Sequence, residues 1–282
     1  MKKIFIVQIV QIIKNWGIVF LIIIILSMIS CNHNRISYKN PDVKILFLHH
    51  STGMNVWKGK LRGMAKFTKR LGPSLVPKLL SYYNKTNGKK YAIERRKFPV
   101  SPYPWENFPY DYYNIWIKNA GDKPFMNNPT LEMLVPEYDV IIFKHCFPFS
   151  NIFPDDSIPD INSKKKTIEN YKLQYEALKN KLNEFRNNKF IIWTGAALVE
   201  KSTNQKEAER SREFIEWMTT EWDRPGDNIY IFDFRAIETE GGLYIKQEYA
   251  VSEYDSHPNE ILSEKAAQML VDRIIEVVEN SN

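Results

Sequence analysis

The sequence predicts an α/β protein with a mostly parallel sheet that helices cover on both faces. Five short runs of aliphatic, β-branched and aromatic residues alternate along the chain with segments of helical periodicity. These runs are almost continuously apolar, which is typical of strands buried on both sides. The 282 residues contain no internal repeat, and no Pro-, Gly- or Ser-rich linker divides the predicted strands and helices, so we expect one domain.

The predicted elements follow from local patterns. The strands are short apolar runs, and the helices have apolar residues every three or four positions, most clearly between Ile168 and Phe185. Pro258 suits the first turn of the last helix, so His257 is expected in the loop before it. In chain order we expect a strand at 43–48, a helix at 74–85, strands at 91–97 and 138–144, a helix at 163–187, a strand at 189–194, a helix at 205–222, a strand at 229–234 and a helix at 258–279.

One stretch breaks this alternation. Residues 98–127 are rich in Trp, Tyr and Phe and are too long for an ordinary connection between a strand and a helix. Aromatic loops over the carboxyl edge of a sheet build pocket walls, which is the role we expect here. The alternative is a loop that folds back as additional core.

The N-terminus resembles a lipoprotein signal peptide. Lys2, Lys3 and Lys14 precede an apolar run from Trp16 to Ile29, which is too short for a membrane span of about 20 residues. Ser30-Cys31 at its end resembles the lipobox, in which Cys31 carries the lipid. We therefore expect a signal peptide at 1–30, a polar tether at 31–42 and the domain at 43–282, outside the cytoplasm and anchored to a membrane. The alternative is an uncleaved signal anchor.

Composition excludes several classes of protein. Hydrophobic residues at 44% and charged residues at 26% exclude a disordered or collagenous chain, and two cysteines exclude a disulfide scaffold. The formal charge of +6 falls to about +3 once residues 1–30 are removed, with only short basic runs, so we expect no nucleic-acid partner. We also expect no metal or other cofactor, because the adjacent His49 and His50 would point to opposite sides of a strand.

Three polar motifs follow predicted strands or precede the last helix. In a parallel sheet these positions lie at one edge. Ser51, in His49-His50-Ser51-Thr52-Gly53, follows the first strand, where ligands bind in open α/β sheets. Ser51 could be a nucleophile if a base lies nearby, or it could cap the next helix. Gly53 permits a close backbone approach.

Asp255-Ser256-His257 precedes the last helix, and Asp255 is near enough to orient the imidazole. The plainer interpretation of His257 is a capping residue at the surface.

The third motif, His145-Cys146-Phe147-Pro148-Phe149-Ser150-Asn151, ends the third strand and could aim a hydrogen-bond donor at the same centre. Cys146 follows an apolar strand and is expected to be buried and inert.

Taken together, these motifs resemble the SGNH/GDSL hydrolase superfamily, over roughly residues 43–280. The resemblance implies a flavodoxin-like three-layer α/β/α sandwich with a five-stranded parallel sheet. It assigns Ser51 as nucleophile, His257 as base and Asp255 as orienting carboxylate. The chain has Asp-x-His where the superfamily has Asp-x-x-His, so Glu253 is a reserve candidate.

The oxyanion hole transfers less directly from the resemblance. Gly121 is the candidate for the glycine of the second block of the superfamily. The asparagine of the third block has no clear counterpart, so His145, Ser150 and Asn151 are each candidates for a donor.

The function that the resemblance implies is ester hydrolysis by a serine esterase, and the membrane-anchored setting with its aromatic loop favours an O-acyl group on a carbohydrate. Two alternatives stay open: an O-acyltransferase of the same fold, and a glycan-binding lipoprotein without catalysis.

Overall fold

The centre of the protein is a five-stranded sheet in the order β2-β1-β3-β4-β5, with every neighbouring pair parallel. The computed structural model describes residues 35–59, 74–155 and 158–280. The five strands begin within two residues of the predicted positions, which confirms the all-parallel α/β prediction. Their bounds are β1 Val43–His49, β2 Tyr91–Lys97, β3 Val140–Phe143, β4 Lys189–Trp193 and β5 Ile229–Phe232.

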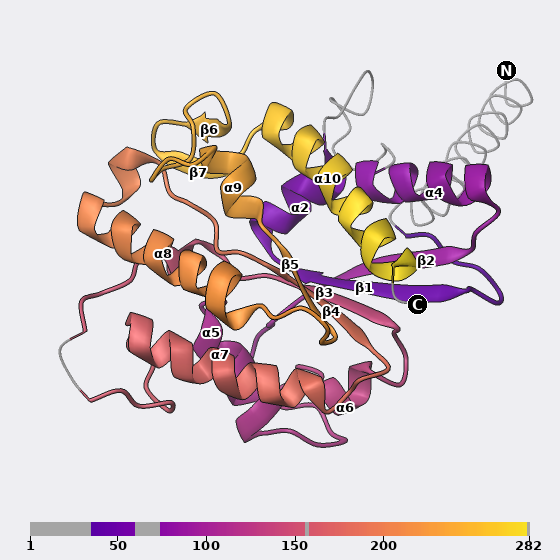
Figure 1. Cartoon of the computed structure of the whole chain (residues 1–282), viewed down its shortest axis with the longest axis horizontal. Helices are drawn as coiled ribbons and strands as arrows, with labels where there is room; N and C mark the ends of the chain where they lie inside the picture. The colour runs from indigo at the N-terminus through magenta and orange to yellow at the C-terminus, as the bar shows by residue number, and fades with distance from the viewer. Residues whose placement is uncertain (1–34, 60–73, 156–157, 281–282) are drawn as a thin grey trace, which may run out of the picture.

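Helices cover both faces of this sheet and complete three layers (Figure 1). On one face lie α2 (Ser51–Lys58), α4 (Leu75–Asn87), α9 (Phe234–Thr239) and α10 (Glu260–Glu279). On the other lie α5 (Pro109–Tyr113), α6 (Leu131–Leu134), α7 (Ile168–Asn183) and α8 (Gln205–Trp217). The remaining elements are the π-helices Asn114–Lys118 and Met218–Trp222, the 3₁₀ turns Phe147–Ser150 and Glu200–Ser202, and the hairpin of β6 (Ala250–Ser252) and β7 (Asp255–Pro258).

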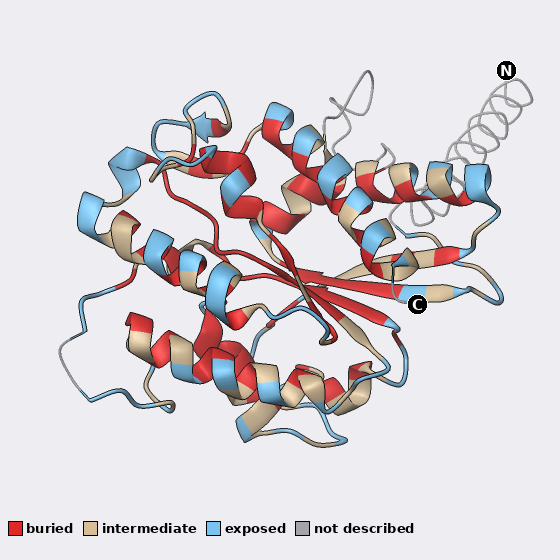
Figure 2. Cartoon of the chain, in the orientation of Figure 1, coloured by how far each residue is buried: buried red, intermediate tan, exposed pale blue. Residues whose placement is uncertain are grey.

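Alternation along each strand produces two separate cores. In β3, Ile141 and Phe143 pack against α7 and α8, whereas Val140 and Ile142 pack beneath α2, α4 and α10. The strands are therefore buried on both sides, while the outer faces of the helices are exposed (Figure 2). Burial of these apolar faces is the main term that stabilises the sandwich.

The aromatic segment at 98–127 divides between the two predicted roles. Most of its rings, including Phe98, Tyr112 and Trp116, are buried in the core beneath α7, so the alternative of additional core holds for them. Trp105 is 37% exposed and lines a pocket, as the first expectation required.

The start of the last helix differs from the prediction. His257 and Pro258 lie in strand β7, and α10 begins only at Glu260. The Asn259 side chain accepts hydrogen bonds from the N–H groups of Ile261 and Leu262 and so caps the helix.

The predicted signal peptide and Cys31 lie outside the described residues. Within the predicted tether, Ile36 forms an antiparallel bridge with Ile93 of the edge strand β2, so this part of it lies against the domain. Among the helices that the structure describes, none is long and apolar enough to cross a membrane.

Candidate active site

Ser51 is the first residue of α2, directly beyond the carboxyl end of β1. Ser51 is exposed, and its Oγ makes no hydrogen bond within the described part of the chain. The first helical hydrogen bond of α2 runs from Met54 N to His50 O, so the N–H groups of Thr52 and Gly53 have no acceptor within the helix. Nucleophilic attack on a carbonyl requires a nucleophile and donors for the oxyanion. The Ser51 hydroxyl and these N–H groups are side by side and are the groups that such an attack uses.

Gly53 lets the first turn of α2 lie close against β1. A Cβ at this position would be 2.6 Å from the Cβ of His49 and 3.0 Å from the Phe47 ring, which is too close for any side chain. The expected close backbone approach at Gly53 is thus confirmed. It holds Ser51 at the edge of the sheet.

Asp255 and His257 form a hydrogen-bonded pair in β7. The Nδ1 of His257 is 2.6 Å from Asp255 Oδ1, and the His257 backbone N–H donates to the same oxygen at 3.0 Å. These bonds, the backbone one foremost, hold the pKa of the Asp255 carboxyl below its usual value. Because β7 is extended, residues two apart project on one side, which explains how Asp-x-His can pair here.

Glu253, the reserve carboxylate, has a different partner. It forms an ion pair with Lys201 at 2.5 Å on the exposed side of the hairpin. The hairpin is itself anchored through Ser256, whose Oγ accepts from Val199 N at 2.9 Å. Asp255 is therefore the carboxylate that orients the His257 ring.

The hairpin packs against α2, so the two predicted halves of the site share one edge of the sheet. Asn55 of α2 donates to the Pro258 carbonyl at 3.3 Å. Phe147, after β3, lies edge-on to the His257 ring, with centroids 4.8 Å apart. The Ser51 hydroxyl and the His257 ring make no direct hydrogen bond in this structure. Phe147 was not among the predicted site residues, although it lies within the third motif.

Gly121 does not belong to this edge. Its N–H donates to Glu132 Oε2 at 3.2 Å, and Glu132 pairs with Lys181 near the end of α7. Both α6 and the end of α7 precede strands, so Gly121 lies at the amino edge of the sheet. The prediction of Gly121 as an oxyanion donor is wrong, because the segment that follows β2 crosses beneath the sheet.

Two candidates of the third motif are buried and form hydrogen bonds within the protein. The His145 ring is fully buried on the face of α7, with Nε2 2.7 Å from the Tyr175 hydroxyl, and burial lowers its pKa to about 3. Ser150 is buried and donates to the Ala196 carbonyl. Neither side chain is free to contact a substrate, which corrects both predictions. Asn151 is half-buried and stays a prediction.

A pocket of about 550 Å³ lies beside Ser51. Its wall includes the ring of His50 stacked on Trp105, with centroids 3.8 Å apart and planes at 18°. The Nε2–H of His50 donates to the Pro99 carbonyl at 2.8 Å and fixes this stack. The lining residues are His49, His50, Ser51, Met54, Lys97, Pro99, Val100, Ser101 and Trp105.

The charges around this pocket are positive. Burial lowers the pKa of His49 to about 3 and that of His50 to about 4, so both rings are neutral at pH 7. Nearby cations lower both values further: Arg95 and Lys144 act on His49, and Lys144 and Lys97 on His50.

Lys144, directly after β3, was missed by the sequence analysis. It is 1% exposed and, among the described residues, has no carboxylate within ion-pair distance; its Nζ lies 3.6 Å from Cys146 Sγ. Cys146 is a buried free thiol, as expected. Glu238, on the same side of the sheet, is fully buried, and burial raises its pKa to about 8. Strand alternation from Ile142 was the signal that could have placed Lys144 on this face.

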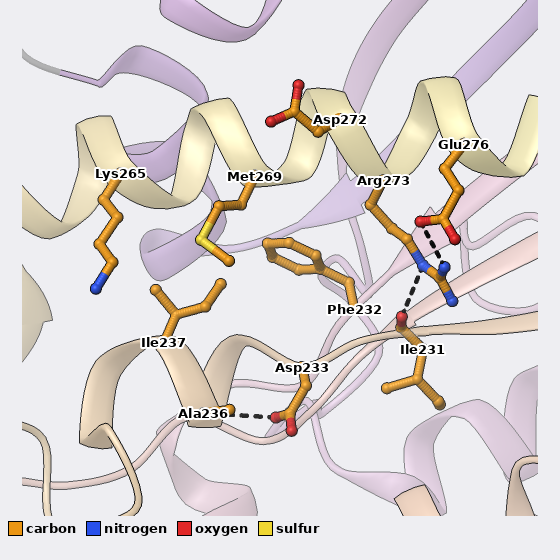
Figure 3. A pocket seen from close by; sticks show the side chains of 10 residues that line it. All are labelled: Ile231, Phe232, Asp233, Ala236, Ile237, Lys265, Met269, Asp272, Arg273 and Glu276. Atoms are coloured by element: carbon orange, nitrogen blue, oxygen red, sulfur yellow. Dashed lines mark hydrogen bonds and ion pairs between the residues drawn. The ribbon is translucent and has the colours of Figure 1, made fainter.

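A second groove of about 590 Å³ lies between β5, α9 and α10 (Figure 3). Met269 and Phe232 form its apolar floor, and Arg273 donates from Nε to the Ile231 carbonyl at 3.0 Å. Its lining contains no Ser, Cys or His, so it offers no hydroxyl or thiol nucleophile with a histidine base. No group of three metal-ligating side chains gathers among the described residues.

No protein-family model and no curated protein matches the sequence. Solved structures similar to this chain include a lipolytic protein of the G-D-S-L family from Desulfitobacterium hafniense (12% identity, 82% of this chain and 99% of that one, TM-score 0.44). Another is the acetylxylan esterase Axe2 from Geobacillus stearothermophilus (12% identity, 85% and 95%, TM-score 0.47). A third is a family two carbohydrate esterase from Cellvibrio japonicus (13% identity, 86% and 63%, TM-score 0.43). The solved structures that are similar to this chain are thus G-D-S-L lipolytic proteins and carbohydrate esterases, at low sequence identity.

Proposed function

We propose that this protein is a serine esterase of the SGNH type. The observation that carries the proposal is the Asp255–His257 pair at 2.6 Å, in a hairpin that packs against the helix beginning with Ser51. An imidazole that is about one third exposed and held by a carboxylate, beside an exposed serine at a helix N-terminus, is the combination that acyl transfer needs.

The proposed reaction uses each group in turn. The Nδ1–H of His257 donates to Asp255, which leaves Nε2 as the base that accepts the Ser51 proton. The Ser51 Oγ attacks the ester carbonyl, and the free N–H groups of the first turn of α2 stabilise the oxyanion; one such donor contributes about 3 kcal/mol in known enzymes. The His257 imidazolium returns its proton to the leaving alcohol, and water then releases the acyl group by the same steps in reverse.

The substrate that we propose is an O-acyl group on a carbohydrate. The pocket beside Ser51 has an aromatic wall in the His50–Trp105 stack and polar groups at its rim, which suits the alternating apolar and hydroxyl surfaces of a sugar. Whether the acyl group passes to water or to a second sugar depends on the acceptor. A product assay with and without added glycan separates hydrolysis from transfer.

The direct test is labelling of the purified full-length chain, in mild detergent, with a fluorophosphonate, followed by peptide mapping. The proposal expects modification of Ser51 and its loss in His257→Ala. Ser101→Ala is the matched control, because Ser101 is a second exposed serine of the same pocket and its removal should leave labelling intact. A folded chain that does not label at Ser51 would contradict the esterase and leave the glycan-binding alternative.

We also propose that the protein is anchored to a membrane outside the cytoplasm by lipid on Cys31. In a bacterial host fed radioactive palmitate, the chain should incorporate label, and Cys31→Ser should lose it. Cys146→Ser is the control for the other cysteine, which is buried. Label that persists in Cys31→Ser would contradict the anchor.

A further inference from the structure

Positively charged side chains surround the pocket beside Ser51, and one of them, Lys97, has no partner in the described part of the chain. Lys97, at the end of β2, lines this pocket together with Ser51. Lys97 is the register partner of His49, so it lies one strand away from the residue that leads into the serine motif. Among the described residues, Lys97 makes no hydrogen bond and no ion pair.

Two further cations add to the positive charge around this pocket. Arg95 projects on the same side of β2 as Lys97, and its Nε is buried without a hydrogen-bond partner. Lys144 lies buried at the end of β3 on the same side of the sheet, with no carboxylate within ion-pair distance in the described part of the chain. Of the residues that the structure does not describe, 1–34, 60–73 and 281–282 contain no Asp or Glu, and 156–157 contain one, Asp156.

The acidic residues near these cations form no ion pair with Lys97. Glu238, which interacts electrostatically with Lys144, is fully buried, and burial raises its pKa to about 8. Glu106, next to Trp105, forms an ion pair with Lys166. Glu94 pairs with Arg96 on the opposite side of β2. None of the nine residues that line the pocket is acidic. Among the described residues no carboxylate pairs with Lys97, which leaves the charge of this lysine available to a ligand.

We propose that this pocket binds a carboxylate-bearing sugar and that Lys97 pairs with the sugar carboxylate. The inference rests on the proposed esterase function and specifies its substrate class: an acyl ester on an acidic glycan. The Trp105 face takes the sugar ring, and the ester is presented to Ser51. One accessible lysine matches the single charge of a carboxylate, since Arg95 and Lys144 are partly or wholly buried and act through their field.

The experiment compares acetylated oligogalacturonides with acetylated xylo-oligosaccharides of equal length as substrates of the full-length chain. The acidic substrate should have the lower KM. Lys97→Met should raise that KM about fivefold with little change in kcat, because an exposed ion pair contributes up to about that factor, and Lys97→Glu should raise it further. The control is Lys85→Met, an exposed lysine at the end of α4, near the amino edge of the sheet, which should leave both substrates unchanged.

A second measurement separates this inference from the esterase proposal. Calorimetric titration of Ser51→Ala with unesterified oligogalacturonide should show binding that weakens severalfold between about 50 and 500 mM NaCl, while any xylo-oligosaccharide binding should be insensitive to salt. Active enzyme with equal KM for both substrates, or equal effects of Lys97→Met and Lys85→Met, would overturn the inference alone. Salt-sensitive binding that depends on Lys97, in a chain that hydrolyses neither ester, would overturn the esterase and retain the acidic-sugar pocket.

Discussion

Two histidines near the carboxyl edge of the sheet have opposite environments. His257 in β7 is about one third exposed and bonds to the Asp255 carboxylate at 2.6 Å. His145, directly after β3, is fully buried and bonds to the Tyr175 hydroxyl at 2.7 Å. An imidazole can act as a base only where it reaches solvent or substrate and where its charged form is stabilised. His257 meets both conditions, whereas His145 meets neither.

The side of the sheet decides the difference for His145. It follows Phe143 by two residues and therefore faces α7, where Tyr112, Phe149 and Tyr175 surround its ring. Its neighbour Lys144 faces α2 and the serine motif instead. The same edge thus presents a sealed aromatic core on one face and a reactive surface on the other.

The largest difference in activity is expected when each of the two histidines is replaced. His257→Ala should lower kcat/KM for 4-nitrophenyl acetate by about 10⁴- to 10⁶-fold, because the serine loses its base. His145→Phe, which keeps the ring volume, should stay within about threefold of the natural chain. Initial rates on folded protein, matched by circular dichroism, give both numbers. A large loss of kcat/KM in His145→Phe would contradict the difference in role between the two histidines.

The next effect separates the carboxylates of the hairpin. Asp255→Asn should lower kcat/KM by about 10²- to 10⁴-fold, because the amide cannot stabilise the His257 imidazolium. Glu253→Gln removes a carboxylate that pairs only with Lys201 and should leave the rate unchanged. Equal losses in the two variants would mean that general charge, and not the Asp255 contact, supports His257. The same rate assay decides between these outcomes.

The buried histidine should matter for stability. His145→Ala should lower the free energy of unfolding by about 2–4 kcal/mol, since it opens a cavity and leaves the Tyr175 hydroxyl without its partner. His257→Ala, at a half-exposed position, should change stability by less than about 1 kcal/mol. Urea denaturation of the three chains measures this, and a reversed order would contradict the assignment of a structural role to His145.

The smallest effect is the pH dependence of stability. Burial lowers the pKa of His145 to about 3, so between about pH 3 and 6.5 the unfolded chain binds a proton that the folded chain does not. Falling pH in that range therefore favours unfolding, by about 1.4 kcal/mol per pH unit for one histidine. His49 and His50 add terms of the same sign, and Glu238, whose pKa is raised to about 8, opposes them above pH 4.5.

His145→Phe isolates the contribution of His145. The stability difference between this variant and the natural chain should shift by about 1.4 kcal/mol per unit as the pH falls from about 6 to 4, in favour of the variant. Urea titrations at each pH provide the values. A difference that stays constant with pH would show that His145 does not titrate on unfolding as proposed.

The sequence alone determined the framework. Five apolar runs predicted the parallel strands within one or two residues at their starts, because continuous burial on both faces leaves a local hydrophobic signature. The same argument placed Ser51 after the first strand and His257 before the last helix, since the ends of parallel strands share one edge. It also proposed Asp255 as the carboxylate for His257, with Glu253 as the reserve candidate.

Long-range packing selects which of the other polar residues lie at this edge. The extended backbone of β7 pairs Asp255 with His257 despite the short spacing. Packing of the aromatic segment sends Gly121 to the amino edge and leaves Trp105 at the pocket. The surroundings of three other side chains depend on which face of the sheet each one occupies and on what packs against that face. These are Lys97, Lys144 and His145. Such contacts join residues far apart in the chain, and a local pattern carries no signal of a partner that long-range packing supplies.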